Sequence, residues 1–90
     1  MNSFLLWGYV RARQLPDGRW LGVTPMMFTA ALCVDLTSAG YAWRYCYASM
    51  GEAVAAMEAW DGQGDAPGNW IKRKGKGEDV LGPGATGEDT

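Results

Sequence analysis

Four aromatic residues alternate with smaller or polar residues between positions 41 and 47. Side chains two positions apart point to the same face of a β-strand, so one face of this segment carries an unbroken row of rings: Tyr41, Trp43, Tyr45 and Tyr47. A small domain must cover one face of its sheet, and this sequence offers a single clear helix to do so. We therefore expect the rings to pack under that helix rather than to face solvent.

The covering helix is predicted from about Met50 to Trp60. Ser49 is followed three positions later by Glu52, the spacing of a capping box, and apolar residues recur behind it at helical spacing. Gly62 suits the left-handed conformation that often ends a helix. The residues that we expect in the core, rather than in a binding site, are Tyr41, Trp43, Tyr45, Val54, Met57, Trp60 and Trp70.

The first 24 residues predict a β-hairpin. Residues 4–13 alternate between two faces, and Leu15-Pro16-Asp17-Gly18 combines the Pro and Gly that a tight turn prefers. Residues 19–24 should then return antiparallel to the first strand. Pro25 should end the second strand because it has no N–H to donate to a neighbour.

Residues 26–36 fit two structures. Thr24 followed by Pro25 resembles an N-cap and first helical position, which predicts a short helix. The apolar run that ends at Leu36 is instead followed by a turn signal at 37–40 and the aromatic row, which predicts a second hairpin. We favour the hairpin.

The C-terminal third changes in composition. Gly, Asp and Pro predict a loop over 61–69, and the segment from Trp70 to Lys74 predicts a last short strand. We expect a single domain over residues 1–81 and a flexible Gly-rich polar tail over 82–90. The predicted fold class is α+β: a small antiparallel sheet of four to five strands with two hairpins, packed on one α-helix in the order β-β-β-β-α-β.

The residue inventory argues against catalysis and metal binding. The sequence has no histidine, so base catalysis would fall to carboxylates, and two cysteines cannot ligate zinc alone. Residues 61–65 imitate the start of a calcium loop, but Ala66 and Lys72 stand where the turn Gly and the bidentate Glu belong. We predict no enzymatic activity, no metal and no cofactor.

Cys33 and Cys46 are predicted to be free, buried thiols. A two-residue turn at Ala39 and Gly40 would place their sulfurs on opposed strand positions. A redox pair therefore stays an alternative.

The basic residues define a possible interaction surface: Arg44, Lys72, Arg73, Lys74 and Lys76. The leading hypothesis is a protein-binding or assembly module, because sheet edges and a loose tail accept partners. The alternative is single-stranded nucleic-acid binding through the aromatic sheet face and the basic segment 72–76. A net charge of −2 and the acids that follow Lys76 weaken that alternative.

No segment predicts secretion or membrane insertion. The N-terminus lacks a positively charged region, and no stretch approaches the roughly 18 apolar residues of a membrane helix. We expect a cytoplasmic protein without membrane contact.

The segment from Trp60 to Lys72, followed by Lys74 and Gly75, reads Trp-Asp-Gly-Gln-Gly-Asp-Ala-Pro-Gly-Asn-Trp-Ile-Lys. It resembles a pattern in small uncharacterised proteins of tailed bacteriophages and prophages, and the likeness covers the C-terminal third. The resemblance implies a setting and assigns no site residue. That setting is a phage-encoded protein in a bacterial cytoplasm, acting as a minor virion component or as an accessory factor directed at the host.

Overall fold

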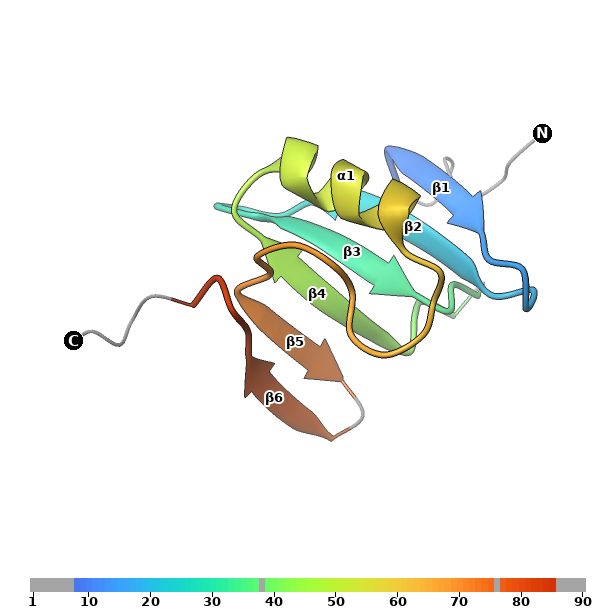
Figure 1. The fold of residues 1–90 in the computed structure, drawn as a ribbon. Coiled ribbons are helices and arrows are strands. Elements are labelled where there is room, and N and C mark those ends of the chain that lie inside the picture. Colours follow the sequence, from blue (N-terminus) through green and yellow to red (C-terminus); the bar gives the residue numbers. More distant parts are fainter. Residues whose placement is uncertain (1–7, 38, 76, 86–90) are drawn as a thin grey trace.

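Six antiparallel strands form one sheet in the computed structural model, which describes residues 8–37, 39–75 and 77–85 (Figure 1). Every strand pairs with its neighbour in the chain, and the only helix among the described residues lies between the fourth and fifth strands. The elements are β1 (Arg11–Gln14), β2 (Trp20–Pro25), β3 (Ala30–Val34), β4 (Trp43–Tyr47), α1 (Met50–Ala59), β5 (Lys72–Gly75) and β6 (Glu78–Leu81). The predicted α+β class is confirmed, whereas the expected four to five strands were too few.

The sixth strand comes from a Gly-rich segment that the sequence did not predict as a strand. Gly75 and Gly77 have φ angles of +125° and +79°, a conformation that glycine adopts more readily than other residues, and Glu78 pairs with Gly75. The chain then continues along the sheet, because the Gly82 and Gly84 N–H groups donate to the Ile71 and Trp70 carbonyls. Residues 82–85, assigned by sequence to the tail, thus contact the domain, and residues 86–90 lie outside the description.

The turn between β2 and β3 decides between the two predictions for residues 26–36. The Met26 N–H donates to the Thr29 carbonyl at 2.8 Å, and Pro25 pairs with Ala30. The short helix therefore does not form, and β3 is a strand buried along its whole length. Pro25 is the last residue of β2, as expected of a residue without an N–H.

The helix α1 covers one face of the sheet, as Figure 1 shows. Its N-cap is Ser49, whose hydroxyl accepts a hydrogen bond from the Glu52 N–H, as the capping-box spacing predicts. Gly62 has a φ of +89°, but it lies two residues beyond the C-cap residue Trp60. The helix packs over β2, β3 and β4, and the buried core includes Leu21, Val23, Leu32, Tyr45, Tyr47, Met57, Trp60 and Trp70.

The four side chains of the aromatic row differ in how deeply they are buried. Tyr45 and Tyr47 are buried, and the Tyr45 ring meets those of Trp60 and Trp70 edge-on, with centroids 5.6 and 5.0 Å away. Trp43 is partly buried, as is Val54 on the helix. Tyr41 is 40% exposed, so its assignment to the core was wrong. It lies two residues before β4, and its hydroxyl accepts a hydrogen bond from Arg44.

The opposite face of the sheet carries a second, smaller cluster. Ala31, Cys33 and Leu36 are buried there, and Tyr9 and Trp20 pack against them. Cys33 pairs with Arg44 and not with Cys46, and both thiols are free. The alternative with opposed sulfurs is therefore wrong. Cys33 is buried, as expected, whereas Cys46 is only partly buried.

Candidate interaction surface

The turn between β2 and β3 exposes three consecutive apolar side chains, Met26, Met27 and Phe28, which we call the hairpin tip. Met27 and Phe28 are each 87% exposed, and Met26 is 39% exposed. They take no part in either hydrophobic cluster. A contiguous apolar surface in water is unfavourable and commonly marks a contact site. These three residues were not among the predicted interaction residues, although apolar side chains at a turn were the available signal.

The predicted basic surface is split between the two faces of the sheet. Arg44 pairs with Lys74 and Cys46 with Lys72, so Arg44, Lys72 and Lys74 share the face opposite α1. Arg73 alternates to the helix face, where its Nη1 donates to the Asp65 carboxylate at 3.0 Å. Lys76 lies outside the described residues.

Of the three described cations on the helix-free face, Arg44 and Lys74 have partners. The Arg44 Nη1 donates to the Tyr41 hydroxyl at 2.7 Å, and this hydrogen bond raises the pKa of the Arg44 guanidinium. The Lys74 Nζ lies 3.8 Å from an Asp79 oxygen, a weak pair because both side chains are exposed. This face keeps a positive balance in the part of the chain that the structure describes.

A pocket of about 220 Å³ lies on this basic face and reaches Thr29, the residue that follows the hairpin tip. It is lined by Thr29, Arg44, Cys46, Ile71, Lys72 and Lys74. Thr29 directly follows Phe28 in the chain, so positive charge lies at the base of the exposed apolar turn. The tip and the basic pocket are therefore adjacent, and we treat them together as one candidate surface.

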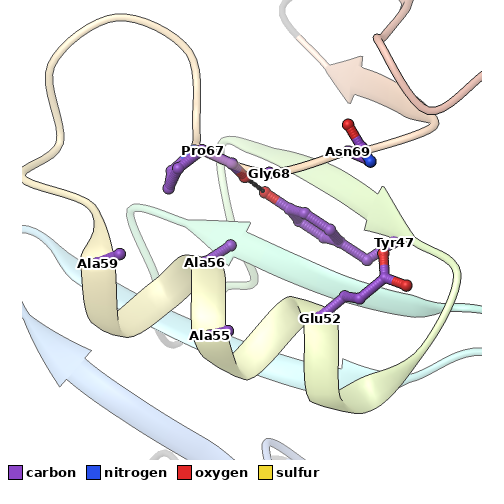
Figure 2. A pocket seen from close by; sticks show the side chains of 8 residues that line it. All are labelled: Tyr47, Glu52, Ala55, Ala56, Ala59, Pro67, Gly68 and Asn69. Carbon is purple, nitrogen blue, oxygen red and sulfur yellow. Dashed lines mark hydrogen bonds between the residues drawn. The ribbon is translucent and has the colours of Figure 1, made fainter.

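A second hollow lies on the helix side, between α1 and residues 67–69 (Figure 2). We call it the helix groove, and its volume is about 390 Å³. Figure 2 shows Glu52 towards the start of the helix and Ala59 towards its end, with the Tyr47 ring pointing at Pro67. The groove is lined by Tyr47, Glu52, Ala55, Ala56, Ala59, Pro67, Gly68 and Asn69.

A third pocket, of about 470 Å³, lies beside Asp65 and contains groups that already bind one another. The Asp65 carboxylate accepts hydrogen bonds from Arg73 and from the Tyr45 hydroxyl, at 3.0 and 3.2 Å. Arg19, also in its lining, bonds to Asp17 and to the Gly62 carbonyl. These contacts fix the loop after α1 and leave little unmet charge for a ligand.

Within the described ranges, no group of three or more His, Cys, Asp or Glu side chains gathers to hold a metal ion. The one helix described there is too short to cross a membrane. In comparisons with known proteins, no family model, no curated protein and no solved structure matched this chain.

Proposed function

We propose that this protein is a non-enzymatic protein-binding or assembly module that docks through the hairpin tip. The observation that carries the proposal is the 87% exposure of both Met27 and Phe28. The tip ends a hairpin whose strands pair at five positions, so it is held in place before a partner arrives. Full burial of each side chain at an interface would contribute about 1.5–3 kcal/mol.

The structure supports nucleic-acid binding less well than protein binding. Bases stack on exposed rings, but Tyr45 and Tyr47, which a stacking sheet face would need, are buried under α1. Tyr41 is exposed, yet its hydroxyl is bonded to Arg44. Three cations remain on the helix-free face, which supports electrostatic contact without a stacking platform.

The biological setting in this proposal follows from the resemblance of residues 60–75 to phage proteins. A phage-encoded module made in a bacterial cytoplasm would bind either another virion component or a host protein. Either role would use a protein-docking surface, and the exposed hairpin tip is such a surface.

Site-specific photo-crosslinking in bacterial cells tests the proposal. A benzophenone amino acid replaces Phe28 at the tip or, as a matched control, Pro16, an exposed residue of the β1–β2 turn at the other end of β2. We expect discrete protein adducts from position 28 that position 16 does not give. Equal labelling from both positions, or adducts only with nucleic acid or lipid, would refute protein docking at the tip.

A further inference from the structure

The hairpin tip and the helix groove have complementary shapes and chemistry. The tip presents two adjacent apolar side chains, Met27 and Phe28, that extend from the sheet into water. The groove is a hollow whose walls are mainly methyl groups, a proline and one face of a buried tyrosine ring: Ala55, Ala56, Ala59, Pro67 and Tyr47. One surface is an apolar projection and the other an apolar recess.

Charges beside the two surfaces are opposite in sign. Lys72 lines the pocket at the base of the tip, next to Thr29. Glu52 lines the helix groove and lies at one end of it, as Figure 2 shows. When a tip enters a groove, a cation beside the first can meet a carboxylate beside the second. Such charge complementarity contributes more to the specificity and rate of association than to its affinity.

Within one chain the two surfaces do not meet. Met27 and Phe28 stay exposed while the groove stays open in the same structure. The tip comes from the β2–β3 turn, and the groove from α1 with residues 67–69. A contact between them must therefore join two molecules, and a contact between two different patches is heterologous.

We infer that the partner of the hairpin tip is a second copy of this chain, whose helix groove receives Met27 and Phe28. This inference rests on the proposed function and names its partner. The tip and groove together are smaller than a standard protein interface, so association should be weak and should depend on concentration. Each chain offers one tip and one groove, which allows rings or filaments as well as pairs.

Two variants test the hairpin tip and the helix groove separately. The tip variant carries Met27→Ser and Phe28→Ser. The groove variant carries Ala55→Gln and Ala59→Gln, which fill the recess with longer side chains at exposed helix positions without adding charge. Pro16→Ser is the matched control, because it replaces an exposed apolar side chain in the β1–β2 turn, at the other end of β2 from the tip. Thermal melts of all variants verify the fold.

Sedimentation across a concentration series gives the readout. The wild type and the control should associate as concentration rises, and each surface variant should associate at least about tenfold more weakly, the usual effect of losing a central interface contact. Mixing the two variants should restore association, but only to pairs, because one variant still has a groove and the other still has a tip.

Three results would overturn the inference. They are a wild type that stays monomeric at every concentration, a groove variant that associates like the wild type, and a mixture that stays monomeric. If position 28 nevertheless crosslinks to a different protein, the protein-docking function stands and self-association fails. If position 28 gives no protein adduct at all, both the protein-docking function and self-association are refuted.

Discussion

The hydroxyl group of Tyr47 donates a hydrogen bond of 2.6 Å to the carbonyl oxygen of Pro67. This bond joins the end of β4 to the segment that forms one wall of the helix groove (Figure 2). The Tyr47 residue is fully buried, and burial raises the pKa of its hydroxyl above the ordinary value of 10.0, so the hydroxyl stays a donor even in mildly alkaline solution. A single side chain thus connects the core of the sheet to a surface feature.

Tyr47→Phe should lower the free energy of unfolding by about 1 kcal/mol, the usual contribution of one hydrogen bond. The ring stays buried, so the change isolates the hydroxyl. Tyr41→Phe is the control, because its exposed hydroxyl accepts a bond from Arg44 and should matter less. Urea titrations of both variants check the difference, and equal losses would contradict the anchoring role of Tyr47.

Gly75→Ala should destabilise the β5–β6 hairpin by about 1–3 kcal/mol, as expected for backbone strain combined with overpacking. Gly75 has a φ of +125°, and a Cβ there would lie 2.6 Å from the Trp43 Cβ and 2.8 Å from the Ala42 carbonyl oxygen. Gly77→Ala in the same turn has a φ of +79° but no such neighbour within 4 Å. It should cost less in thermal melts, and a reversed order would refute the steric argument.

Stability should fall as the pH rises above 9. Burial raises the pKa of the Cys33 thiol from 9.0 to about 12 and that of the Tyr9 hydroxyl from 10.0 to about 12. Between these values the unfolded chain has lost protons that the folded chain keeps, so alkali favours unfolding. Urea midpoints at pH 7.5, 9 and 10.5 should decrease in that order, and Cys33→Ala should reduce mainly the second decrease, because the unfolded thiol loses its proton above its ordinary pKa of 9.0. A midpoint that does not change with pH would contradict this linkage.

Charge reversal should control the self-association inferred above. Lys72→Glu and Glu52→Lys should each weaken it by about fivefold, equivalent to roughly 1 kcal/mol for an exposed pair. The double variant restores opposite charges and should associate as the wild type does. Sedimentation at low and high salt measures the effect, and double variants that stay as weak as the singles would exclude a Lys72–Glu52 contact.

Local patterns predicted most of the fold. The capping box at Ser49 and the alternation from 41 to 47 specify α1 and β4, because both signals act between residues close in sequence. The β6 strand was missed because it is held mainly by backbone pairing with β5, and among the side chains of residues 79–81 only Val80 packs against the core. Composition carries little information about such pairing.

The register of the β3–β4 hairpin shows a second limit. Thr37 forms a bridge with Gly40, so the turn is centred one residue earlier than a turn at Ala39 and Gly40 would be. That shift moves every pairing by two positions and places Arg44 opposite Cys33. Turn geometry, rather than strand composition, decided which side chains oppose one another.

The candidate surface was predicted only in part. Alternation along β5 separates Lys72 and Lys74 from Arg73, a consequence of strand structure that charge clustering alone does not reveal. Met27 and Phe28 were missed because apolar residues are usually assigned to a core, and exposure depends on where the turn falls in three dimensions.

The nearest-neighbour order of the sheet has a consequence for synthesis. Each of the strands β2, β3 and β4 pairs with the strand made just before it, and only the β4–β5 pair encloses α1 and its loop. A chain with this connectivity closes mostly short loops, which favours rapid folding. As the chain leaves the ribosome, the first four strands can therefore pair before the last two have been translated.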